Sequence, residues 1–208
     1  MAANEQSMGN LSSKIQLTLH TYHATRAWKG RGVESGKHQI IGVRQFLFLA
    51  GRIQQDAAKD DPYADYWMVE IEQKLKECQE RLNELLQESD RLLDMIPKEL
   101  SVEENVNQQP FKTPVFTGGQ QGWLAIRLLI DFDRFARNIL LAQHVALIGR
   151  TEMHAYMREA NHLIRSLCTF PQRYPGYSGV SRDDFAANNA KAREAVDKYG
   201  EVPADILR

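Results

Sequence analysis

The stretch Trp67–Ile96, WMVEIEQKLKECQERLNELLQESDRLLDMI, carries an unbroken heptad pattern over nearly four repeats. Apolar or small residues recur at alternating steps of four and three, namely Ile71, Leu75, Cys78, Leu82, Leu85, Ser89, Leu92 and Ile96. This spacing keeps one narrow stripe on one side of a helix. The sequence therefore predicts a long helix that buries this stripe against another helix, either in the same chain or in a second copy.

The charges are segregated along the chain, although the formal net charge is only −1. Residues 59–105, which include the heptad helix, hold fourteen acidic residues against six basic ones. Residues 1–58 hold seven basic residues against three acidic ones, and residues 106–208 hold thirteen against ten. A basic surface built from both ends of the chain would attract a polyanion such as DNA.

The length of the chain and its two cysteines limit the classes of protein to which it can belong. A chain of 208 residues is long enough for one domain with a real core. We expect a flexible tail at 1–12, a single mainly helical domain at 13–200, and a C-terminal tail at 201–208. The two cysteines lie far apart on apolar helical faces, which is typical of a reduced, cytoplasmic protein. Met1–Asn10 has no signal-peptide pattern, and no apolar run is long enough to span a membrane.

The remaining elements follow from periodicity and from helix start and stop signals. Lys14–Tyr22 alternates apolar and polar residues like a half-buried strand. Trp123–Ile148 fits either a strand or a helix, and its length favours a helix. The other predicted segments are a basic loop at Thr25–His38, a helix at Gln39–Ala58, an edge strand at Pro110–Thr117, a helix at Glu152–Leu167 capped by Thr151, and a helix at Ser181–Tyr199 capped by Ser181. We expect a mainly α fold with about five helices and one or two short strands.

No pattern in the sequence indicates catalysis or a cofactor. His20 and His23 would point to opposite faces of a strand and would not share a metal ion. Asp60–Asp61 stand just before the heptad helix, which Asp61 is placed to cap with Pro62 at the first helical position. Asp183–Asp184 lie at the start of the predicted helix Ser181–Tyr199. Negative charge at both places is favourable for the helix dipole. Phosphate-binding, dinucleotide-binding and hydrolase motifs are missing from the chain. A non-enzymatic protein without cofactor, metal or small-molecule substrate is therefore favoured.

The N-terminal strand suggests how the chain binds DNA. A lone strand cannot satisfy its own backbone groups, and the simplest partner is the same strand of a second copy. Such a two-stranded ribbon fits the major groove, where alternate side chains reach base edges. The residues expected to face bases are Lys14, Gln16, Thr18 and His20, and those expected to neutralise phosphates are Arg26, Lys29 and Arg31. The alternative is an ordinary edge strand packed on the helices.

Segments spread over nearly the whole chain resemble the AcaB-like proteins of integrating conjugative elements and conjugative plasmids. They are Leu19–Arg31, Ile41–Gly42, Asp61–Trp67, Leu128–Asp133, Ala142–Ile148 and Gly200–Leu207. The resemblance implies a ribbon-helix-helix transcriptional activator of transfer genes that acts as a homodimer.

The chain departs from a compact ribbon-helix-helix domain in one respect. In such domains the first helix follows the strand almost at once, whereas Thr25–His38 intervenes here. A second possible ribbon is Phe111–Thr117, with Lys112 and Thr113 as the residues that read DNA. We therefore expect a cytoplasmic, homodimeric DNA-binding regulator. The alternative is an accessory or scaffold protein of a conjugative element that acts through helix-mediated protein contacts.

Overall fold

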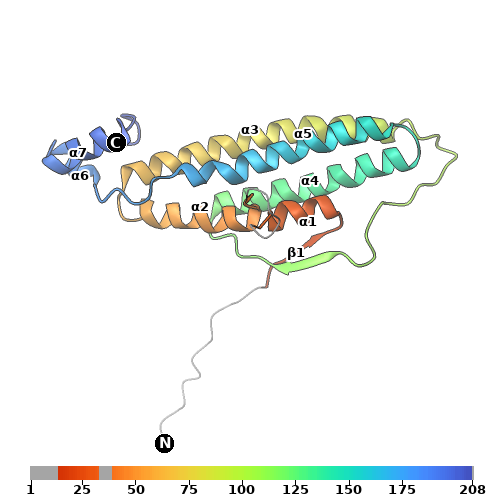
Figure 1. Cartoon of the computed structure of the whole chain (residues 1–208), viewed down its shortest axis with the longest axis horizontal. Coiled ribbons are helices and arrows are strands. Elements are labelled where there is room, and N and C mark those ends of the chain that lie inside the picture. Colours follow the sequence, from red (N-terminus) through yellow and green to blue (C-terminus); the bar gives the residue numbers. More distant parts are fainter. Residues whose placement is uncertain (1–13, 33–38, 208) are drawn as a thin grey trace, which may run out of the picture.

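The computed structural model describes residues 14–32 and 39–207, and within them it shows a bundle of long helices with a two-stranded sheet (Figure 1). The elements, in order, are β1 (Gln16–Leu19), α1 (Tyr22–Lys29), α2 (Val43–Ala57), α3 (Pro62–Leu93), β2 (Phe111–Pro114), α4 (Gln120–His144), α5 (Arg150–Thr169), a 3₁₀ turn η2 (Phe170–Arg173), α6 (Arg182–Ala186) and α7 (Ala190–Tyr199). The prediction of a mainly α fold with one long helix is confirmed. The predicted N-terminal tail lies outside the described residues.

Helix α3 starts where the sequence predicts a cap and ends three residues early. The Asp61 carboxylate accepts the backbone N–H of Tyr63 at 3.0 Å, and Pro62 occupies the first helical position. The central seam residues Ile71, Leu75, Cys78, Leu82, Leu85 and Ser89 are all buried. Helix α3 packs against α2, α4 and α5 of the same chain. The apolar stripe is therefore used inside the molecule.

Two further helices differ from prediction in their boundaries. The ambiguous stretch Trp123–Ile148 is helical only as far as His144, in α4, which begins three residues before Trp123; Leu128, Phe132, Phe135, Ile139 and Ala142 share its buried face. Helix α5 begins at Arg150, and the predicted cap Thr151 is wrong. The Glu152 carboxylate instead accepts the backbone N–H of Gly149 at 2.8 Å, so the chain is already turned into the helix before Thr151.

The predicted final helix Ser181–Tyr199 is two helices, α6 and α7. Ser181 caps α6 as expected. The break comes at Asn188, whose φ of 45° is left-handed, after which Asn189 caps α7 by accepting the N–H of Ala192 at 3.0 Å. Asparagine competes with the helix by offering local hydrogen bonds, and here that competition ends one helix and starts another.

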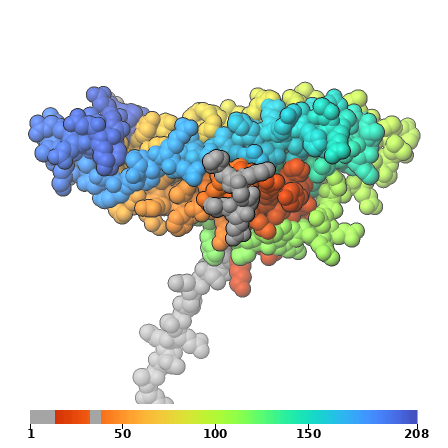
Figure 2. All heavy atoms as spheres, viewed as in Figure 1, coloured from red at the N-terminus to blue at the C-terminus, as the bar shows by residue number. Residues whose placement is uncertain are grey.

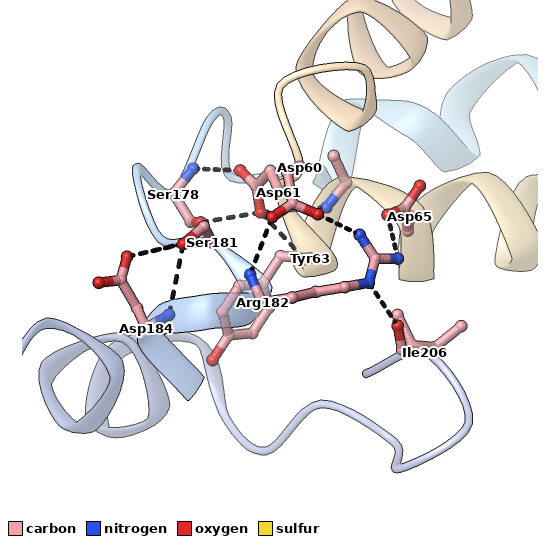
Figure 3. A network of polar contacts seen from close by, with 10 residues as sticks. Asp60, Asp61, Tyr63, Asp65, Ser178, Ser181, Arg182, Asp184 and Ile206 are labelled. Carbon is pink, nitrogen blue, oxygen red and sulfur yellow. Dashed lines mark hydrogen bonds and ion pairs between the residues drawn. The ribbon is translucent and has the colours of Figure 1, made fainter. Parts of the chain in front are cut away.

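The C-terminal helices dock on the start of α3 through a polar network and a small second core (Figure 3). Arg182 reaches Asp60 and Asp65 at 2.7 Å each, and its Nε donates to the Ile206 carbonyl at 3.2 Å. The Asp61 carboxylate also accepts the backbone N–H of Ser178 at 2.6 Å. The paired aspartates thus position a helix, as the sequence suggested, and also hold the C-terminal segment.

Candidate nucleic-acid interface

Strand β1 pairs antiparallel with β2 of the same chain, so the premise that β1 lacks a partner in its own chain is wrong. Thr18 lies directly opposite Lys112, and Gln16 lies opposite Pro114. The two ribbons that the sequence offered as alternatives are therefore the two strands of one ribbon. Sequence reasoning could not pair them because the long helix α3 separates them along the chain.

The ribbon has one buried face and one open face. Directly opposite residues of an antiparallel pair share a face. Leu17 and Leu19 are 3% and 1% exposed, and they form part of the main core. Gln16 and Lys112 are exposed on the other face, with Thr18 between them half-buried. Thr113 lies opposite Leu17, on the inner face, and so does not share the open face with Lys112.

The backbone pattern explains why a proline fits in β2. The N–H of Val115 donates to the carbonyl of Ile15 at 3.0 Å, which makes this pair a hydrogen-bonded one. Because hydrogen-bonded pairs alternate along an antiparallel ladder, the backbone groups of Pro114 point away from β1. A residue without an N–H is tolerated at that edge position. By the same alternation, the backbone groups of Gln16 and Thr18 point to the outer edge of β1.

A buried carboxylate of α4 fixes the turn that joins β1 to α1. Asp133 is 4% exposed. It accepts the backbone N–H of His20 at 2.9 Å, the backbone N–H of Thr21 at 2.8 Å and the Thr21 hydroxyl at 2.7 Å. The Thr21 oxygen in turn accepts the N–H of Ala24 at 3.1 Å and caps α1. Asp133 thereby sets the position of the ribbon relative to the helices.

Two predicted site residues have contacts that tie them to the fold. The ring nitrogen Nδ1 of His20 accepts the N–H of Asn107 at 3.2 Å, which fastens the connection between α3 and β2. The ammonium of Lys29 lies 4.7 Å from the ring centre of Phe111 in β2, a cation–π contact that links α1 to the ribbon. Lys14 is exposed just before β1, and Arg26 is exposed on α1.

The predicted basic loop Thr25–His38 is partly wrong, because α1 extends through Lys29. Thr21 caps this helix, and the burial of Ala24 and Trp28 supplies an apolar face that the loop interpretation overlooked. Beyond it, Arg31 and Ile40 form an antiparallel bridge with N–H to carbonyl distances of 2.7 and 3.0 Å. Residues 33–38 of the predicted loop lie outside the described residues.

The glycines at this bridge allow two segments to approach closely. Gly30 has a φ of 76°, and a Cβ there would lie 2.3 Å from the carbonyl oxygen of Ile40; a Cβ on Gly42 would lie 2.3 Å from the carbonyl oxygen of Trp28. Only glycine accommodates both the positive φ and the backbone contact. The bridge therefore fixes the position of Arg31 just after the end of α1.

The described residues also bear on metal and thiol chemistry. None of their His, Cys, Asp and Glu side chains gather in a group of three or more able to hold a metal ion. His23 is in a helix and His20 is not, so the strand geometry assumed for this pair does not apply. Cys78 and Cys168 are both buried free thiols, and burial raises the pKa of each. Over the same residues, no helix combines the length and hydropathy needed to cross a membrane.

Comparison with protein families decides the class. The family model of the transcriptional regulator AcaB matches residues 7–208. The chain belongs to the AcaB family. Membership implies a non-enzymatic regulator of transcription that binds DNA.

A comparison with solved structures gives the fold of a second member. AcaB from uropathogenic E. coli, crystallised with selenomethionine, matches with a TM-score of 0.60 and 13% sequence identity. The match covers 94% of this chain and 96% of the other, so the two share an overall fold. A comparison with curated proteins found no match.

The segments that carried the resemblance meet in space. Leu19–Arg31 contacts Leu128–Asp133 through the Asp133 hydrogen bonds. Asp61–Trp67 contacts Gly200–Leu207, since the Tyr63 hydroxyl donates to the Gly200 carbonyl at 2.7 Å. Sequence reasoning missed Asp133, although a signal was present. The helical period places it on the same face as Leu129 and Ala136, where a carboxylate needs buried partners.

Proposed function

We propose that this AcaB-family chain regulates transcription of genes on a conjugative mobile element by inserting the open face of its β1–β2 ribbon into the major groove of DNA. The observation that carries the proposal is the register that sets Thr18 beside Lys112 on that face, with Gln16 next along β1. An amine, an amide and a small hydroxyl are groups that hydrogen-bond to base edges. The opposite face is packed on the helices, which hold the ribbon rigid.

Basic side chains beside the ribbon would bind the DNA backbone. Lys14 precedes β1, and Lys29 lies over the β2 ring of Phe111. Arg26 is one turn earlier on α1, and Arg31 follows its end. Contacts of this kind position a protein on DNA without reading the sequence, and each adds about 0.9 to the salt dependence of binding.

We also propose a homodimer in the manner of ribbon-helix-helix regulators. The outer edge of β1 offers the backbone groups of Gln16 and Thr18, and the sheet of the described residues has only two strands. Antiparallel pairing of β1 with β1 of a second copy would set the two β1 strands at the centre of a four-stranded sheet with both open faces on one side, so the central β1 strands would enter the groove and the β2 strands would flank it. The regulator would act in the cytoplasm, where its DNA lies. Sedimentation of the purified protein measures whether the dimer exists.

The test of the ribbon is DNA binding with matched lysine variants. Wild type is titrated with DNA from its own genomic neighbourhood and with unrelated DNA, at low and high salt. Lys112→Gln on the ribbon is compared with Lys191→Gln, an exposed lysine of α7.

We expect Lys112→Gln to lose discrimination between the two DNAs by roughly 1–3 kcal/mol, the range for one base contact. We expect Lys191→Gln to behave as wild type. Equal discrimination in both variants would show that the ribbon does not read bases. Wild type that binds neither DNA would exclude the proposed function itself.

A further inference from the structure

Helix α5 carries its acidic and basic side chains on different flanks. Glu159 accepts a hydrogen bond from Arg81 of α3 at 2.8 Å, so the acidic flank faces α3. Asn161 and Arg165 lie on the other flank, where they line a groove that α1 shares. Arg158 is three residues before Asn161 and seven before Arg165, and this spacing places it on the same flank. Because the acidic flank of α5 faces α3, its basic flank, with Arg158 and Arg165, is turned toward α1.

A shallow groove lies between α1 and α5. Its base is apolar, with Ile41, Ile164 and Cys168 all buried. Three arginines stand around it: Arg26 from α1, Arg31 from the bridge after α1, and Arg165 from α5. No acidic residue lines the groove within the described part of the chain. Figure 2 shows α5 and α1 side by side on one face of the molecule.

The described arginines divide into those held in ion pairs and those that form none, and Arg91 and Arg193, on other faces of the molecule, belong to the second group. Arg81, Arg134, Arg137 and Arg182 each pair with at least one carboxylate. Among the described residues, Arg26, Arg158 and Arg165 form no ion pair, and all three are exposed. Uncompensated positive charge above an apolar base attracts anions more strongly than charge spread over open surface.

The local electrostatics agree with this geometry. His23 lies on α1 close to Arg26 and to His154 of α5. Burial lowers the pKa of His23, and the positive charges of Arg26 and His154 lower it further.

From this groove we infer that Arg26, Arg158 and Arg165 bind phosphates of the DNA backbone and extend the interface from the ribbon across α1 to α5. The inference rests on the proposed function and adds a second contact region to it. Lys29 makes the connection, since it lies on α1 and contacts Phe111 of β2. Figure 1 shows α1 between β1 and the long helices.

The length of the stripe favours a nucleic-acid strand over a small anion. Arg158 and Arg165 are seven residues apart, which is about 10 Å along a helix. Each DNA strand presents one phosphate about every 3.4 Å along the duplex axis. The two arginines can therefore contact different phosphates of one strand, whereas a free phosphate or a mononucleotide would contact only one of them.

The test compares the double variant Arg158→Gln/Arg165→Gln with the control Arg91→Gln/Arg193→Gln. The control removes the same charge from exposed positions on α3 and α7. Binding to DNA from the protein's own genomic neighbourhood and to unrelated DNA is measured over a salt series for both variants and for wild type. Because all four arginines are exposed, thermal unfolding should confirm that both variants fold.

We expect the groove variant to lose about two units of the salt slope, and to lose affinity equally for both DNAs while discrimination is kept. The control should keep the slope of wild type. A groove variant that binds like wild type would overturn the inference and leave the ribbon proposal standing. A wild type that binds no DNA would overturn both, and a ribbon variant that loses only discrimination separates the two regions.

Discussion

Replacing Asp133 with asparagine tests whether this carboxylate holds the ribbon in place. Its Oδ1 accepts both the N–H and the hydroxyl of Thr21, and its Oδ2 accepts the N–H of His20. Asparagine has one carbonyl oxygen, which can satisfy Thr21. Its NH₂ group then meets the His20 N–H, and two donors cannot bond to each other.

The magnitude follows from the bonds that change. One charge-assisted hydrogen bond is lost at a site where Asp133 is 4% exposed, and the two that remain lose the charge. Hydrogen bonds to charged groups contribute about 1.5–3 kcal/mol, so Asp133→Asn should lower the free energy of unfolding by about 2–4 kcal/mol. The control is Asp131→Asn on the same helix. Asp131 accepts one bond from Gln79 at 2.9 Å, on a partly exposed surface. Its replacement should cost below about 1 kcal/mol.

Urea unfolding followed by circular dichroism measures both variants, with the slope against urea checked for equality. Amide hydrogen exchange then locates the destabilised region. In Asp133→Asn, the increase in exchange rate should be largest over residues 17–29. If the two variants unfold within about 0.5 kcal/mol of each other, Asp133 does not anchor the ribbon and the argument from its hydrogen bonds is refuted.

Three further predictions concern the buried thiol, the α1 histidine and the C-terminal dock. Burial raises the pKa of Cys168 to about 12, so a thiol reagent near pH 8 should modify Cys168 roughly 1,000-fold more slowly in the native protein than in the unfolded chain; similar rates would contradict this. The pKa of His23 is lowered in the fold by burial, Arg26 and His154, so the unfolded chain binds the proton more readily. Lowering the pH through about 6.5 should therefore destabilise wild type, and His23→Gln should lose less free energy of unfolding over the same range. An equal loss in the two proteins would contradict this. Arg182→Ala should cost about 1 kcal/mol and speed amide exchange over residues 178–207, whereas Arg193→Ala on α7 should do neither; equal exchange in both would mean that Arg182 does not hold the dock.

Particular residues show how far sequence reasoning reaches. The seam from Ile71 to Ser89 predicts α3 and its buried face. Asp61 and Ser181 predict two helix starts, because an N-cap needs only the backbone N–H groups two or three residues on. The prediction that Thr151 caps a helix is wrong for an equally local reason. The Glu152 carboxylate accepts the N–H of Gly149, and the helix has already begun before Thr151. Each outcome depends on a few neighbouring residues.

The candidate interface was predicted in parts. Gln16, Thr18 and Lys112 were each selected from strand patterns, yet on two ribbons that were thought to compete. Arg26 was selected as a phosphate contact without its neighbour Arg165, which lies far along the chain. Composition and spacing therefore predict suitable residue types, but they do not indicate which of these residues lie together in the folded chain.

The sequence by itself determined the local elements of this protein, because helix period, strand alternation and caps are set by residues within a few positions of one another. It also carried the segments by which the AcaB family is identified. Only the tertiary structure decided that β1 pairs with β2, that α3 packs on α2, α4 and α5 of its own chain, and that α1 and α5 share a basic groove. The physical reason is that a contact between distant segments depends on which faces the packed helices bring together. The entropy of closing a long loop varies only slowly with its length, so spacing along the chain does not indicate which segments meet.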